Sequence, residues 1–347
     1  MTKFKINFNF HDDGSVFVNS VNAGTVKNAA LNVNVTGQTG EDSSGVKQDL
    51  SAEMKTFYDK VLIRSAEPYL VHDQFGQKRP IPKGSGKTIE FRQFSTLPKA
   101  LTPLTEGVTP DGQKYSVMAF HATVQQYGAY IAISDMLELT AFDNQMAEIT
   151  KMLGAQAGLT SDTITRDELC QSTNVIRPND RAQRTDLVAG DILSVKDIKK
   201  AVRALKRKNI PTIGGNYVAI VHPDTVYDLW NDDEWIEASK YAGSTQIFQG
   251  EVGKLYGVRF VESTEAKIFE NGVYATLVLG ENAFGVTSIN NGGIETITKQ
   301  LGSGGSSDPL NQRATVGWKM NKAVKILEQS RMVMIEHKSS LTSAAAN

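Results

Sequence analysis

The sequence predicts an α+β protein with two subdomains and a long two-stranded loop that protrudes from them. The chain has 347 residues, which is more than one compact core usually holds. Helical and strand-like periodicities follow one another along it. A proline-rich stretch at 95–112 lies between two strand patterns and has no core of its own. These three observations predict the fold class.

Residues 1–50 are predicted to form an N-terminal arm. Residues 3–10, KFKINFNF, alternate between apolar and polar positions, which is typical of a half-buried strand. Residues 11–48 are rich in Gly, Asn, Ser and Thr and contain too few apolar side chains for a core. A disordered tail is the alternative interpretation. An arm that carries a strand can add to the edge of a neighbour's sheet.

Residues 51–86 are predicted to form a helix followed by a linker. Pro68 and Pro80 interrupt the helical pattern, and residues 77–86, QKRPIPKGSG, are typical of turns. The apolar stripe of this helix consists of Leu50, Met54, Phe57, Tyr58, Val61 and Leu62.

The protruding loop is predicted from the two strand patterns at 87–94 and 115–133. Residues 95–112 between them contain three prolines and two glycines. Because an isolated hairpin is only marginally stable in water, we expect this loop to need a partner surface.

The longest helix is predicted from Asp143 to Gln171, a length of roughly 43 Å at 1.5 Å per residue. Gly154 and Gly158 lie inside it, and each costs about 1 kcal/mol relative to Ala in a free helix. We therefore expect another element to pack closely there. The predicted apolar stripe consists of Phe142, Met146, Ile149, Leu153, Gln156, Thr160 and Ile164.

A second, mixed α/β region follows a polar linker at 174–193. Ser194 and Asp197 are typical of a helix start, and Val195, Ile198, Val202 and Leu205 give that helix one apolar face. A buried strand is predicted at 217–221, with a helix from Pro223 through Trp230. Further strands are predicted at 254–263, 273–279, 284–289, 314–320 and 331–337. Residues 302–309 are interpreted as a flexible loop, and the last two strands are expected to return to the first region.

The candidate enzyme motifs in the sequence lack residues or spacings that their chemistry requires. GSGKT at 84–88 lacks the first glycine of a phosphate-binding loop, because residue 81 is Ile, and a strand pattern follows where a helix is required. No two of the five histidines have the spacing of metal ligands, and His121 is interpreted as a core or interface residue. Cys170 alone forms neither an intrachain disulfide nor a cysteine metal site, and is interpreted as a small buried residue. We expect no enzymatic activity, no cofactor and no metal.

Charged residues form two clusters. Asp228, Asp232, Asp233, Glu234 and Glu237 are interpreted as a solvated helix face. A basic stretch comprises Lys196, Lys199, Lys200, Arg203, Lys206, Arg207 and Lys208. One interpretation is loose contact with DNA phosphates through Lys199, Lys200, Arg203, Lys206 and Arg207. The other is a solvated or intersubunit face. The formal net charge of −1 predicts that any contact with DNA is local and weak.

Six motifs resemble those of one family, in order and spacing. They are KTIEFRQF at 87, LTPLTEGVTPDG at 101, QQYGAYIAISD at 125, YVAIVHPDTVYDL at 217, GEVGKLYGVRFVES at 250 and SDPLNQRATVGWKM at 307. From about residue 60 to 337 the chain resembles major capsid proteins of tailed bacteriophages. The resemblance is to the branch typified by the large-genome coliphage that packages its own virion RNA polymerase.

This resemblance implies the Hong Kong 97 coat fold, with an arm, an extended loop, a peripheral domain on a long spine helix, and an axial domain. It implies a virion protein, assembled in the host cytoplasm into hexamers and pentamers of an icosahedral shell around double-stranded DNA. The implied parts are the arm at 1–50, helix and linker at 51–86, extended loop at 87–133, spine helix and peripheral domain at 134–189, axial domain at 190–300, and return strands and tail at 301–347.

Partners and contacts follow from the same resemblance. We expect other copies of the chain, packaged DNA and, in addition, scaffolding, portal and decoration proteins, with no membrane partner. Only about 50 residues precede the matched region, so scaffolding is expected to be a separate protein. Intersubunit contacts are expected at Lys99, Glu106, Lys114, Asp308 and Arg313. Covalent crosslinking is not predicted, because Lys99 and Lys114 have no assignable asparagine partner or catalytic glutamate.

Three alternatives stay open from the sequence. The first is the shell protein of an encapsulin-type bacterial nanocompartment, which has the same fold and encloses an enzyme cargo. The second is a hydrolase or nucleotide-binding enzyme that uses GSGKT. The third is a phage tail-tube or decoration protein.

Overall fold

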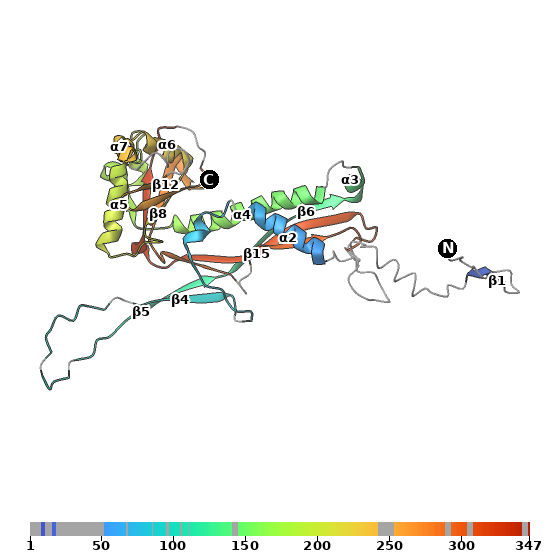
Figure 1. The fold of residues 1–347 in the computed structure, drawn as a ribbon, viewed down its shortest axis with the longest axis horizontal. Coiled ribbons are helices and arrows are strands. Elements are labelled where there is room, and N and C mark those ends of the chain that lie inside the picture. The colour runs from blue at the N-terminus through green and yellow to red at the C-terminus, as the bar shows by residue number, and fades with distance from the viewer. Residues whose placement is uncertain are drawn as a thin grey trace.

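The chain consists of an elongated layer with a seven-stranded unit at one end and a hairpin that projects from their junction (Figure 1). A computed structural model gives this structure. The residues that it describes are 8–10, 16–18, 52–66, 69–84, 86–94, 97–104, 106–109, 111–140, 145–241, 253–288, 293–303, 308–341 and 346–347. Most of the predicted arm, and part of the loop predicted at 302–309, lie outside the described residues. Strands β1 (Phe8–Phe10) and β2 (Val16–Val18) form an antiparallel pair.

The seven-stranded sheet forms the core of the second region. Its order is β7-β16-β12-β8-β10-β9, and β11 pairs with β12. Strands β8, β12 and β16 are buried along their whole length, because side chains pack on both faces of the sheet. The bounds are β7 Val175–Ile176, β8 Tyr217–Val221, β9 Lys254–Leu255, β10 Val258–Glu262, β11 Ile268–Phe269, β12 Val273–Leu279 and β16 Met332–His337.

Helices α5 (Val195–Arg207), α6 (Pro223–Trp230) and α7 (Asp233–Tyr241) lie beside this sheet (Figure 1). The predicted apolar face of α5 is confirmed, since all four of its side chains are buried. Ser194 Oγ donates to Asp197 (2.8 Å), whereas the backbone N–H of Val195 donates to Asp232 (3.0 Å). A distant residue therefore satisfies the N-terminus of this helix.

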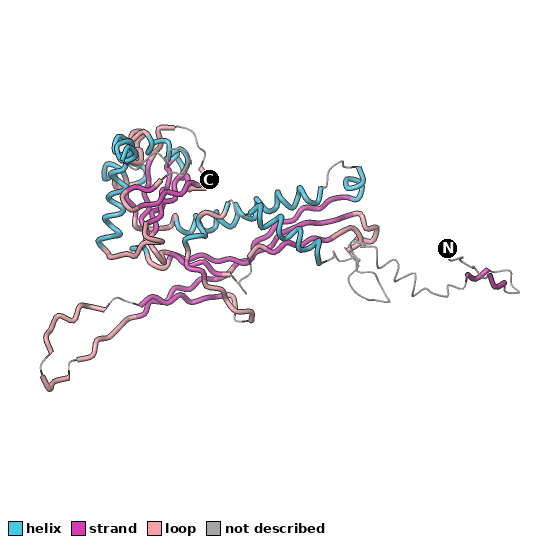
Figure 2. Tube along the Cα trace, viewed as in Figure 1, coloured by secondary structure: helices cyan, strands magenta, loops and turns pink. Residues whose placement is uncertain are grey.

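The elongated layer is built on one long strand, β15 (Arg313–Ile326). It pairs with β6 (Gln125–Ser134) along ten positions and with β13 (Phe284–Thr287) along its last four. Strand β14 (Glu295–Lys299) pairs with its other edge, and β3 (Gln77–Lys78) extends β13. Helices α2 (Ala52–Ala66) and α4 (Gln145–Leu169) cover one face of this sheet, and α3 (Asp135–Thr140) follows β6 (Figures 1 and 2).

Helices α2 and α4 pack closely at the two glycines, as predicted. A Cβ atom on Gly154 would lie 2.5 Å from the carbonyl oxygen of Leu62, and one on Gly158 would lie 2.5 Å from that of Ala66. The predicted apolar stripe of α4 is wrong in part, because the buried face is turned toward small and polar residues. That face comprises Met146, Thr150, Leu153, Gly154, Ala157, Gly158, Ser161, Asp162, Thr165, Arg166 and Leu169.

Polar side chains on this face form a buried polar network, the Lys322 network, which connects α4, β15 and the short helix η2 (His72–Phe75). The Lys322 ammonium donates to Asp73 (2.5 Å) and to the carbonyl and hydroxyl oxygens of Ser161 (2.7 and 2.8 Å). Burial lowers the pKa of Lys322, and the Asp73 charge opposes that effect. Beside it, His72 Nδ1 lies 2.6 Å from an Asp162 carboxylate oxygen. Buried charges of this kind are stable only when paired.

Several placements differ from the sequence prediction. The pattern at 115–133 forms two strands, and β6 belongs to the elongated layer instead of the loop. The pattern at 254–263 forms the two short strands β9 and β10. Strand β16 does not return to the first region; it pairs with β12 and β7 in the seven-stranded sheet, where its apolar run is covered on both faces. His121 is exposed on a two-stranded hairpin, so the core interpretation is wrong, and the interface interpretation stays a prediction. Short 3₁₀ helices complete the fold at η3 Pro178–Asp180, η4 Arg184–Asp186, η5 Glu270–Gly272 and η7 Gln329–Arg331.

None of the helices among the described residues combines the length and apolar character needed to cross a lipid bilayer. The same residues contain no cluster of side chains suited to hold a metal ion.

Candidate intersubunit surfaces

The extended loop leaves the body of the protein as an antiparallel ribbon. Strands β4 (Thr88–Phe94) and β5 (Val117–Thr123) pair from Thr88 opposite Thr123 to Phe94 opposite Val117. The Phe94 and Tyr115 rings make the last cross-strand contact, with centroids 6.0 Å apart. Beyond it the described loop residues have no ladder partner. They expose Leu97, Leu101, Leu104, Val108 and Tyr115, with Leu101 81% accessible.

The base of this ribbon is anchored in the elongated layer. Phe91 is 2% exposed, and its ring lies against Gly285 of β13, where a Cβ atom would come within 2.6 Å of it. Ile81, Ala122 and Val124 complete this small cluster. The anchored base fixes the direction in which the loop projects, while the loop itself has no packing partner among the residues that the structure describes.

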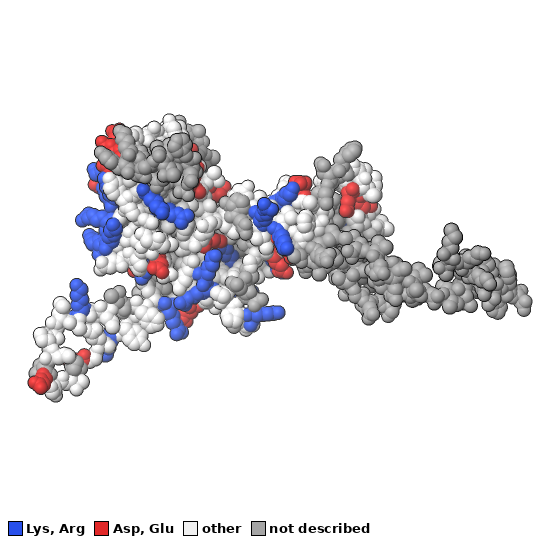
Figure 3. Space-filling model, viewed as in Figure 1, with Lys and Arg blue, Asp and Glu red and all other residues white. Residues whose placement is uncertain are grey.

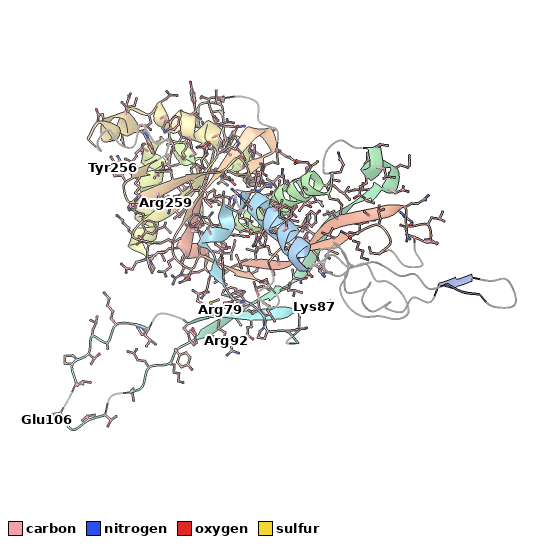
Figure 4. All side chains as sticks on the ribbon, turned by 45° about the vertical axis from the view of Figure 1, so that its right-hand side comes forward. Arg79, Lys87, Arg92, Glu106, Tyr256 and Arg259 are labelled. Carbon is pink, nitrogen blue, oxygen red and sulfur yellow. The ribbon has the colours of Figure 1, made fainter. Side chains whose placement is uncertain are left out.

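The charged loop residues expected to contact neighbours all point into solvent. Lys99, Glu106 and Lys114 are exposed, and Figure 4 shows Glu106 at the far end of the loop. None of the three pairs with another side chain within the described residues. Their contact with a neighbouring subunit stays a prediction.

Asp308 and Arg313 lie together at the start of β15. The Asp308 carboxylate is buried and accepts the backbone N–H groups of Gln312 (3.2 Å) and Arg313 (2.9 Å). Asp308 therefore holds the turn into β15, and its contact with a neighbour stays a prediction. Arg313 is exposed and lines a hollow of about 760 Å³, which also contains Tyr130 and Lys299.

The GSGKT segment does not form a phosphate-binding loop. Gly84 and Gly86 have φ angles of 86° and 87°, which are turn conformations, and strand β4 begins at Thr88. A phosphate-binding loop requires a helix N-terminus at that point. Cys170, which follows α4, is partly buried, and burial raises the pKa of its thiol to about 12. That thiol is inert at neutral pH.

The acidic cluster near α6 and α7 is only partly a solvated face. Asp233, Glu234 and Glu237 are exposed, as predicted. Asp228, in contrast, is buried and accepts hydrogen bonds from the backbone N–H (3.0 Å) and hydroxyl of Ser340. Asp232 accepts from the α5 N-terminus. The prediction was wrong for Asp228, because Ser340 meets it only in the folded chain. Asp232 is half-buried and precedes α7, at the start of a helix as predicted.

The predicted basic residues form one face of α5, visible as a cluster of Lys and Arg beside the helix (Figure 3). Lys199 pairs with Glu234, and its ammonium lies 4.4 Å from the centroid of the Tyr256 ring. Lys200 pairs with Asp180 (3.1 Å). These two pairs lie nearer the helix N-terminus, while Arg203, Lys206 and Arg207 are exposed.

The sequence analysis predicted the basic face of α5 but missed the buried Lys322 network, because no local pattern marks a lysine in a strand as buried.

The sequence and the fold are similar to those of known phage capsid proteins. A family model described as phage capsid protein matches residues 118–333, more than half of the chain. No curated protein matches the sequence. The capsid of cyanophage Pam1 is 15% identical, with a TM-score of 0.61 over 87% of this chain and 97% of that chain.

Two further capsids are similar in fold. The capsid of Ralstonia phage GP4 is 14% identical, with a TM-score of 0.61 over 78% of this chain and 89% of that chain. The acid-stable capsid of Helicobacter pylori bacteriophage KHP30 is 11% identical, with a TM-score of 0.58 over 94% of this chain and 100% of that chain. The chain belongs to the phage capsid protein family, and it is a major capsid protein with the Hong Kong 97 coat fold.

Proposed function

We propose that many copies of this chain assemble, in the host cytoplasm, into hexamers and pentamers of an icosahedral shell around the double-stranded DNA of a tailed phage. The extended loop carries this proposal. It exposes five large apolar side chains on a ribbon that the described part of its own chain does not cover. Burial of each such side chain is worth about 1.5–3 kcal/mol, so a neighbouring subunit supplies the surface that the loop lacks.

The two parts of the body take different places in this proposal. The seven-stranded unit is the axial domain near the capsomer centre, and the elongated layer on α4 is the peripheral domain. The extended loop crosses to the next subunit, with Lys99, Glu106 and Lys114 as polar contacts, and Asp308 and Arg313 lie on the receiving layer. Scaffolding, portal and decoration proteins are further partners. The resemblance to the coliphage branch that packages its own RNA polymerase supports placing the chain in that branch.

Assembly is tested with two loop variants of matched size. The apolar variant carries Leu101→Ser, Leu104→Ser and Val108→Ser, and the control carries Thr102→Ala, Thr109→Ala and Gln113→Ala. Both are imaged by negative-stain electron microscopy after size-exclusion chromatography. We expect the apolar variant to remain folded and to form no shells, while the control assembles like the original chain. Normal shells from the apolar variant, or from a chain that lacks residues 97–110, would contradict the role of the loop.

The contents and shape of native assemblies decide between the alternatives. Shells that hold double-stranded DNA support the phage capsid. Shells that hold a protein cargo and no DNA would identify a nanocompartment instead, and tubes would identify a tail protein.

A further inference from the structure

The exposed side of α5 carries cations that no carboxylate neutralises within the described part of the chain. From Ile198 to Lys208 the sequence IKKAVRALKRK contains six Lys or Arg residues and no Asp or Glu. Lys199 and Lys200 have carboxylate partners. Within the described part of the chain, no acidic side chain pairs with Arg203, Lys206 or Arg207. The net charge of the chain is −1, so this excess is local and not a property of the whole surface.

These cations line a groove with an aromatic wall. The groove has a volume of about 510 Å³ and is lined by Lys199, Val202, Arg203, Lys206, Arg207 and Tyr256. Val202 is buried and forms its apolar floor. Tyr256 belongs to the tight turn between β9 and β10, where Tyr256 and Gly257 both have positive φ angles (50° and 79°). This turn places the ring beside α5, under the Lys199 ammonium (Figure 4).

The geometry points to a polyanion as the ligand of this groove, and we propose that it is the phosphate backbone of the packaged DNA. A hollow lined by charges of one sign attracts counter-ions more strongly than the same charges spread over a flat surface. Long Lys and Arg side chains contact phosphates without reading sequence, as a container for a whole genome requires. The inference rests on the proposed shell and adds an orientation to it, with the α5 face of the seven-stranded unit turned toward the lumen.

Weak binding by each subunit suits this role. Three unpaired cations neutralise few phosphates, so one subunit holds DNA weakly and in a salt-dependent way. Many copies on one closed surface add such contacts together, because each bound site raises the effective concentration of its neighbours. The DNA is thereby kept near the wall and is still free to leave.

The same unit offers a matched control. Val258 and Phe260 of β10 pack in the core cluster with α5, so Arg259 between them points to the opposite face. Lys254 lies opposite Arg259 in the antiparallel register, and both are exposed. The test pair is Lys206→Gln with Arg207→Gln, and the control pair is Lys254→Gln with Arg259→Gln. Each pair removes one lysine and one arginine from the full chain.

Binding of a short labelled DNA duplex to soluble subunits is measured by fluorescence anisotropy between about 50 and 200 mM salt. We expect the test pair to reduce the slope of log K against log salt by about 2, because each lost phosphate contact removes about 0.9. The control pair leaves the slope unchanged. Equal changes in both pairs, or no change in either, would overturn the proposal.

Electron microscopy of the same variants separates the remaining outcomes. Shells from the test pair support a lumen surface, since the groove is then not needed for assembly. Loss of shells with an unchanged DNA slope would overturn the proposal and identify the face as an intersubunit contact. If the original chain forms no shells even when it is co-expressed with its scaffolding protein, the proposed function fails, whereas the titration on soluble subunits still reports on the groove.

Discussion

The seven-stranded unit buries its large apolar side chains within one chain, whereas the extended loop leaves its own exposed. Leu277 of β12 is 2% accessible, and Leu104 of the loop is 76% accessible. The same residue type thus contributes to folding in one region and is available for association in the other. Stability of the subunit and stability of the assembly are therefore separable by mutation in this protein.

The largest expected difference comes from truncating these two leucines. Leu277→Ala should lower the free energy of unfolding of the subunit by about 2–5 kcal/mol, because it leaves a cavity between packed layers. Leu104→Ala should lower it by less than about 0.5 kcal/mol, since the side chain has no core to leave. Urea denaturation of both variants measures the two values. Similar losses would show that the loop is packed in the free subunit.

The next largest effect on the free energy of unfolding is expected in the buried Lys322 network. Lys322→Met should cost about 3 kcal/mol, because Asp73 then stays in a largely buried site without its cation. Lys325→Met is the matched control on the same strand. Lys325 pairs with Glu168 (2.8 Å) at a more exposed position, so its loss should cost less than about 1 kcal/mol. Equal costs in denaturant titrations would refute the distinction between the two pairs.

The third effect is a pH dependence that arises from a buried histidine of the seven-stranded unit. Burial lowers the pKa of His337 to about 4, from 6.5 for a free histidine. The unfolded chain therefore binds the proton more readily, so the stability contribution is complete above pH 6.5 and is lost as the pH falls toward 4. The loss is at most about 3 kcal/mol.

Thermal unfolding between these pH values should be less pH-dependent in His337→Gln than in the original chain. His121→Gln is the control, because His121 lies exposed on the hairpin and should not alter the profile. An identical pH profile for the His337 variant and the original chain would show that another group is responsible.

The smallest effect on folding is expected at the tip of the loop. Glu106→Lys should change the free energy of unfolding by less than about 0.5 kcal/mol, because the side chain is exposed and unpaired within the described residues. It should nevertheless impair shell formation, as scored by electron microscopy. Glu270→Lys makes the same charge change on an exposed turn of the seven-stranded unit. Equal losses of shells from both variants would indicate an effect of net charge instead of a loop contact.

Local patterns predicted much of this fold. The long helix α4, the α5 helix with its buried face, and strands β4, β8 and β12 lie where periodicity placed them. The glycines of α4 predicted a close neighbour, and Leu62 and Ala66 of α2 supply it. Each of these features depends on residues that are close in sequence, which is why the sequence was sufficient.

The features that sequence reasoning missed depend on distant partners. The buried side of α4 includes Ser161, Asp162 and Thr165, polar residues that are tolerated there only because η2 and β15 supply matching groups. Asp228 is buried because Ser340, far along the chain, donates to it. Hydrophobic periodicity assigns such residues to solvent. The expected contact residues of the loop stay predictions, because the structure of a single chain does not test contacts between subunits.

Strand β15 has a mechanical consequence. Its ten pairings with β6 run along the length of the elongated layer, and its last four residues pass without a break into the pairing with β13. A force along the layer therefore acts parallel to β15, so its hydrogen bonds are loaded in shear. Bonds loaded in this way share the force and do not break one after another. Strand β15 therefore carries tension from one end of the elongated layer to the other.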